Sequence, residues 1–157
     1  MRIYLHEPQA EPTLLEEVEE TARFRDICAV EEEIFVFLDD HDEPVEVDVL
    51  IVEVLRERGH KPGHHHVHRH PCRQISVEVH YGGDTRPVLA TPNQTIGVVL
   101  TRALQAYGID ATSGADLVLR RPGSADDLSQ NEHLGDLHPG ENCKLELNLL
   151  PAQREAG

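Results

Sequence analysis

The stretch that decides the fold reads TIGVVLTRALQAYG and spans residues 95–108. Its apolar side chains recur at the spacing of one helix face, so a helix would carry them in a single stripe. The stripe consists of Ile96, Val99, Leu100, Ala103, Leu104 and Tyr107. Thr95 stands where an N-cap accepts a backbone hydrogen bond, and Gly108 stands where helices commonly end. The pattern predicts an amphipathic helix that covers one face of a sheet.

Strands are predicted on both sides of this helix. Residues 75–81 alternate between apolar and polar side chains, and Gly82-Gly83-Asp84 then reads as the turn of a half-buried hairpin whose second strand is 87–91. Leu117-Val118-Leu119 gives a third strand, and Leu145, Leu147 and Leu149 supply the inward face of the last one. The predicted order is β-β-α-β-(β)-β.

This order, with a helix packed across a mixed sheet, is similar to the β-grasp fold of ubiquitin. The resemblance covers residues 73–157 and rests on the helix start and end, the middle strand, the loop before the last strand, and the last strand with its tail. The matching residues are Thr95-Ile96, Gly108-Ile109, Leu117 to Leu119, Leu134-Gly135-Asp136-Leu137, and Leu145 to Leu149 with the tail to Gly157. The chain ends in Glu155-Ala156-Gly157 where ubiquitin has a diglycine. Ala156 disfavours an ordinary ubiquitin-activating enzyme, whereas a dedicated enzyme could accept it.

The first half reads as a second, shorter unit of the same kind. Ile3-Tyr4-Leu5 is a predicted strand, and Thr13 with Glu16 resembles a capping box that opens a helix to about Phe24. Residues 34–38 form an apolar run typical of a buried strand. Val45, Val47, Val49 and Ile51 alternate as a further strand, although residues 49–56 fit a short helix equally well. The predicted fold class is therefore α+β, with two tandem ubiquitin-like β-grasp domains of which the first is divergent.

The predicted domain boundaries follow from these elements. Residues 1–68 form the divergent N-terminal domain, 69–74 a linker, 75–150 the ubiquitin-like domain, and 151–157 a flexible conjugation tail.

Two such units with a glycine tail resemble the modifier of bacterial Bil antiphage conjugation operons. The segments Cys72-Arg73-Gln74-Ile75 and His80-Tyr81-Gly82-Gly83 are similar to related bacterial multi-ubiquitin proteins. The resemblance implies an antiphage role and three partner enzymes, which are an E1-like activating enzyme, an E2-like conjugating enzyme and a deubiquitinase-like peptidase. It also implies that Gly157 donates its carboxylate to a target protein and that the activating enzyme and the peptidase read Ala156 and the rest of the tail. We expect the exposed sheet face of the second domain to dock them through His80, Arg120 and Asn148.

The charge and composition of the chain limit the kinds of partner that it can bind. The net charge is −15, with 18 acidic and 7 basic side chains in residues 1–70 against 11 and 7 in residues 71–157. Such a charge disfavours nucleic acid and anionic membranes and favours a basic protein partner. No membrane span or secretory signal is predicted. Cys28, Cys72 and Cys143 lack Cys-x-x-Cys spacing, which favours reduced thiols and a cytoplasmic location.

A run of histidines between the two units suggests a metal site. Alternation would place His64, His66, His68, His70 and Cys72 on one face of an extended segment, and imidazole and thiolate are common zinc ligands. Ligands in line on one strand cannot surround a tetrahedral ion, so these five are weak candidates. We expect a polar linker or edge strand, with a pH-sensitive hinge as the alternative, and no resident metal or cofactor.

Catalysis by this chain itself is not expected. The sequence contains neither a nucleophile elbow nor a glycine-rich phosphate loop. With Lys61 and Lys144 as its two lysines, the protein is expected to be attached singly rather than in branched chains. The competing hypothesis is a ubiquitin-like adaptor that binds a partner through the second sheet and is not conjugated.

Overall fold

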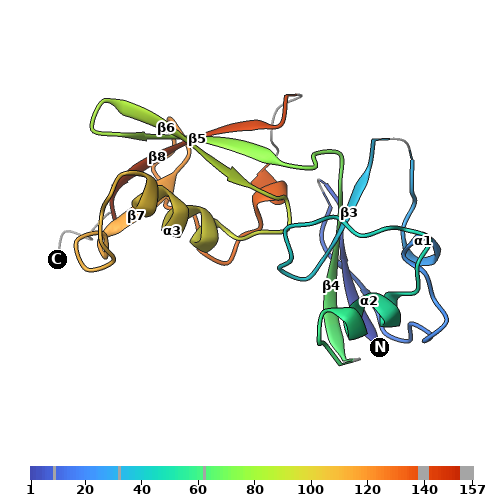
Figure 1. Cartoon of the computed structure of the whole chain (residues 1–157). Coiled ribbons are helices and arrows are strands. Elements are labelled where there is room, and N and C mark those ends of the chain that lie inside the picture. Colours follow the sequence, from blue (N-terminus) through green and yellow to red (C-terminus); the bar gives the residue numbers. More distant parts are fainter. Residues whose placement is uncertain (9, 32, 62, 138–141, 153–157) are drawn as a thin grey trace. The chain divides into compact units, whose positions relative to one another are not determined.

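The chain forms two compact units, Met1–Arg73 and Gln74–Gly157, in the computed structural model. The structure describes all residues except 9, 32, 62, 138–141 and 153–157 (Figure 1). Each unit contains one four-stranded mixed sheet. Among the described residues, no helix combines the length and the apolar character needed to cross a bilayer.

The elements of the second unit follow the predicted order except at its bracketed strand, which is not found among the described residues, where a 3₁₀ helix lies instead. They are β5 (Ile75–Tyr81), β6 (Asp84–Ala90), α3 (Ile96–Ala106), β7 (Leu117–Arg120), the 3₁₀ helix η1 (Leu134–Leu137) and β8 (Lys144–Pro151). The sheet order is β6-β5-β8-β7, with β5 and β8 parallel and the other pairs antiparallel. Gly82 and Gly83 have φ of +58° and +81°, which a two-residue hairpin turn of this hand requires.

Helix α3 covers one face of this sheet (Figure 1). Its buried residues are Ile96, Val99, Leu100 and Ala103, as the predicted stripe requires. From the sheet, the fully buried Val77, Val79 and Leu147 share this core. Thr95 is the N-cap, and its hydroxyl accepts a hydrogen bond from the backbone N–H of Val98. Burial of these apolar side chains is the main stabilising contribution of the unit.

The first unit repeats the sheet of the second. Its elements are β1 (Arg2–His6), β2 (Thr13–Leu15), α1 (Phe24–Ile27), β3 (Phe35–Leu38), α2 (Ile51–Glu57) and β4 (His64–His70). The order is β2-β1-β4-β3, with β1 and β4 parallel and the outer pairs antiparallel. The two units are therefore tandem ubiquitin-like β-grasp domains, and the first is the divergent one.

The predicted helix from Thr13 to about Phe24 is wrong. Thr13 to Leu15 form strand β2, which pairs with β1 through Leu5 and Thr13. A helix here would place Glu16 against Glu19 and Glu20 at helical neighbour positions, where like charges repel. Pairing with β1 satisfies the backbone without that repulsion. Of the two readings for residues 45–56, the helix is confirmed as α2.

The histidine run is neither a linker nor an edge strand. It forms β4, an interior strand between β1 and β3, so that expectation is wrong and the strand continues to His70. The expectation of reduced thiols is also wrong for two of the cysteines, since Cys72 and Cys143 are disulfide-bonded whereas Cys28 is a free, buried thiol.

Candidate functional site

One row of side chains crosses the outer face of the second sheet, opposite α3. His80 on β5 pairs in register with Asn148 on β8, and Asn148 pairs with Arg120 on β7. Their strand neighbours Val79, Leu119 and Leu147 are buried in the core, so alternation places the row on the other face. The three residues predicted to share this face are thus brought together, although 68 positions separate His80 from Asn148 in the sequence.

Neighbouring side chains hold the histidine end of the row. His80 Nδ1 lies 2.7 Å from the hydroxyl of Thr85 on β6, and its Nε2 lies 3.5 Å from a carboxylate oxygen of Glu146 on β8. The His80 side chain is 35% exposed and that of Glu146 is 63% exposed. Both can therefore meet a partner, with the ring orientation already set by Thr85.

The arginine end is covered. Arg120 donates from Nε to a carboxylate oxygen of Asp127 at 2.9 Å, and its Nη2 contacts the same oxygen. The backbones of Arg120 and Asp127 also form an isolated antiparallel β-bridge. Only 10% of the Arg120 side chain is exposed. Arg120 therefore orders the segment after β7 and offers a partner less surface than His80 does.

An exposed leucine extends the same face and was not among the predicted site residues. Leu89 on β6 pairs with Ser76 and is 51% exposed, whereas its neighbours Val88 and Ala90 are buried. The alternation of the segment contained this signal, because a large apolar residue falls on the solvent side. We name this set of side chains the outer row, and it consists of His80, Asn148, Arg120, Leu89 and Glu146.

Tyr107 fixes the hairpin that carries His80. Its hydroxyl donates to the carbonyl of Val79 at 2.7 Å and lies 3.2 Å from that of Asp84, and the Arg86 guanidinium stands 4.9 Å above its ring. Burial raises the pKa of the Tyr107 phenol, and the nearby Asp84 carboxylate raises it further. The Arg86 hydrogen bond lowers the pKa of Asp84. The hairpin end is thereby held against the C-terminus of α3.

The predicted conjugation residues Gly157 and Ala156 lie outside the described residues. The last described backbone hydrogen bond before them runs from the N–H of Ala152 to the carbonyl of Asp116, at 2.8 Å.

The histidines predicted as weak metal candidates lie on the first unit. His64, His66, His68 and His70 alternate with Val67 of the core and so share the outer face of β4. Cys72 lies beyond the strand, and its N–H donates to His70 Nδ1 at 2.9 Å. As a disulfide-bonded residue it has no free thiolate for a metal.

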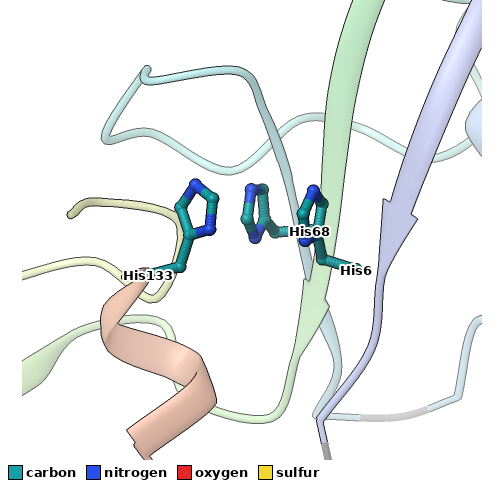
Figure 2. Close-up of side chains that lie close together, drawn as sticks. All are labelled: His6, His68 and His133. Atoms are coloured by element: carbon teal, nitrogen blue, oxygen red, sulfur yellow. The ribbon is translucent and has the colours of Figure 1, made fainter. Parts of the chain in front are cut away.

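A further histidine, not predicted, joins this face from the neighbouring strand. His6 on β1 pairs in register with His68, and the two rings stack with centroids 4.1 Å apart and planes within 6° (Figure 2). His6 Nε2 also lies 2.8 Å from His66 Nδ1. No spacing rule could find this contact, because 60 residues separate His6 from His66.

Comparison with known protein families identifies the type of domain that the second unit forms. Residues 76–152 match the family model described as BilA ubiquitin-like domain 2. No curated protein matches the chain. Among solved structures, the ubiquitin of Caldiarchaeum subterraneum is 19% identical with a TM-score of 0.40, and the alignment covers 53% of this chain and 99% of that one. An Arabidopsis thaliana protein is 14% identical with a TM-score of 0.41, over 54% and 94% of the two chains.

Proposed function

Because this chain is a ubiquitin-like protein of the BilA type, with the family's second domain over residues 76–152, we propose that it is a protein modifier. In this proposal the Gly157 carboxylate is joined to an amine of a target protein, in the cytoplasm and in defence against phage. The family match carries the proposal, since it assigns the domain directly before the tail.

The chemistry divides between this chain and its partners. The Gly157 carboxylate attacks ATP on an E1-like enzyme, which releases pyrophosphate and leaves an acyl-adenylate, and a thiol of that enzyme then displaces AMP to form a thioester. The thioester passes to a thiol of an E2-like enzyme, and the target amine displaces that thiol to form an isopeptide bond. A deubiquitinase-like peptidase reverses or trims the product. This chain supplies the carboxylate and the recognition surfaces rather than a catalytic group, and neither nucleic acid nor membrane takes part.

The outer row supports a docking role in these steps. His80 and Glu146 are exposed while Thr85 orients the imidazole, so the surface is ordered before a partner arrives. Leu89 adds an apolar contact at the sheet edge. Ordered side chains lose less conformational entropy on binding. Within the outer row, the exposed His80 and Glu146 offer a partner more surface than the covered Arg120 does.

Mass spectrometry of cells that contain the chain and its three partner enzymes tests the proposal. The expected finding is a peptide in which Gly157 is joined to an amine of another protein. A chain extended by one residue after Gly157 should form no conjugate when the peptidase is absent, whereas a chain with one residue added before Met1 should conjugate normally. Conjugates from the C-terminally extended chain under those conditions would contradict attachment through Gly157.

A non-conjugated adaptor is the second candidate, and the ordered outer row favours it too. An adaptor would bind its partner through the second sheet and leave the tail inert. The C-terminal extension separates the two functions, because it blocks a modifier and leaves adaptor binding unchanged. Replacement of His80 by Ala should weaken partner capture under either function.

A further inference from the structure

We propose that His6 and His66 form a binding site for Ni²⁺ or Cu²⁺ on the outer face of the first unit. His6 Nε2 and His66 Nδ1 lie 2.8 Å apart, from the adjacent parallel strands β1 and β4. Each atom is a ring nitrogen that has an in-plane lone pair when it carries no proton, and neutral imidazole is a common ligand for these metals. The site comes from two ladder strands rather than from the histidine run alone. It is independent of the proposed conjugation.

The distance between the two nitrogens selects the metal. An ion about 2.0–2.1 Å from each nitrogen would see them at an angle of roughly 90°. That angle belongs to square-planar or octahedral coordination, with water in the other positions, and not to the tetrahedral coordination of Zn²⁺. The geometry therefore favours Ni²⁺ and Cu²⁺ over Zn²⁺.

Stacked rings hold both ligands in place. Tyr4 stacks on His66 with centroids 5.0 Å apart and planes within 17°, and His68 stacks on His6. Tyr4 and His68 are positioning residues, because they restrict the rotation of the ligand rings without supplying the two facing nitrogens. Ligands held on rigid elements bind a metal with less loss of conformational entropy.

Metal binding replaces the hydrogen bond that the two rings share. One ring donates an N–H to the other, so that ring must move its proton to its second nitrogen before both facing nitrogens can bind an ion. The ion and the protons compete for the same lone pairs, and binding should therefore weaken as the pH falls. His66 is exposed, which gives the ion access to the pair.

The chain contains a close second pair that serves as a control. His41 and His60 have their Nε2 atoms 2.9 Å apart, but neither residue lies on a strand or helix, and their rings meet edge to face at 78°. Without ladder pairing their nitrogens are less fixed, so we assign the site to His6 and His66.

Calorimetric titration of the full chain with nickel chloride, after dialysis against a chelator, tests the site. His66→Gln and His64→Gln are the matched variants, because both positions are exposed histidines on the same face of β4. We expect H66Q and H6Q each to raise the Kd by at least about tenfold, and H64Q and H41Q to change it by less than about twofold. Circular dichroism should show that each variant keeps its fold.

Three outcomes would overturn the inference. Equal losses for H64Q and H66Q, with no loss for H6Q, would mean that the histidine run binds nickel adventitiously and that His6 plays no part. A loss for H41Q with none for H66Q would move the site to the other pair. In NMR spectra of the wild type, Cu²⁺, which is paramagnetic in both geometries, should broaden the amide signals of β1 around His6 as well as those of β4, and broadening confined to β4 would also overturn the inference.

Discussion

The two units have the same sheet but place their longest helix differently. In the second unit α3, with 11 residues, lies between β6 and β7, whereas the first unit has the four-residue α1 at the corresponding point and places α2 between β3 and β4. Both sheets nevertheless pair their first and last strands in parallel. The difference indicates that strand pairing sets the topology of the sheet. The helix that covers the sheet can lie in a different connection between strands.

The outer faces also diverge at equivalent positions. His6 and His68 in the first sheet correspond to His80 and Asn148 in the second, since each pair joins the first and last strands in register. In the first unit this row is built of imidazole rings, and in the second it is polar and bonded to Thr85 and Glu146. The same backbone therefore presents two different chemistries.

The largest expected effect is a difference in stability between substitutions on the two faces of the second sheet. Leu147→Ala should lower the free energy of unfolding of this unit by about 2–5 kcal/mol, because Leu147 is fully buried beneath α3. Leu89→Ala, on the opposite face, should change it by less than about 0.5 kcal/mol. Hydrogen exchange of the β5 and β8 amides measures the free energy of unfolding of both variants. Similar costs for the two leucines would show that the outer face is covered rather than open.

Tyr107→Phe tests how far the hairpin of the second unit depends on the hydroxyl of Tyr107. Loss of its hydrogen bond to Val79 should cost about 1 kcal/mol. The folded-state pKa of Tyr107 is raised, so its contribution is complete below the unfolded-state pKa of about 10 and is lost as the pH rises through the folded value. Denaturant unfolding between pH 8 and pH 11, as an approximate range, should show this loss in the wild type. If Y107F loses stability over the same pH range by the same amount, another group is responsible.

The caps of the two main helices differ, and this predicts an effect on stability of similar size. Thr95 caps α3 with its side chain, while Leu50 at the start of α2 provides no such bond. Thr95→Ala should destabilise the second unit by about 0.5–2 kcal/mol, and Thr95→Ser should restore most of the loss. Thermal unfolding measures both variants. A failure of serine to rescue would assign the effect to the methyl group instead.

The smallest effect is expected from the lysines, one in each unit. Lys61 and Lys144 are exposed, and single attachment through Gly157 requires neither. Replacement of both by Arg should leave the pattern of target conjugates unchanged on a denaturing gel. Loss of all conjugates in this variant would contradict single attachment.

Sequence reasoning was most successful where the evidence was local. The α3 stripe, the alternation of β5 and the Gly82-Gly83 turn each specify an element through side chains close together in the chain. It failed for Thr13 to Leu15, because three residues do not distinguish a strand from a helix start and pairing with β1 decides the outcome. It also treated the histidine run as a linker, because a polar strand lacks the apolar signal of an interior strand.

The sequence by itself determined the β-grasp architecture of the second unit, since helix and strand periodicities and turn residues act over a few positions. It also placed His80, Arg120 and Asn148 on one sheet face. Only the tertiary structure decided that Asp127 covers Arg120, that Thr85 orients His80 and that His6 meets His66. Such contacts depend on which strands become neighbours and in what register, and that choice is made by the packing of the whole unit rather than by spacing along the chain.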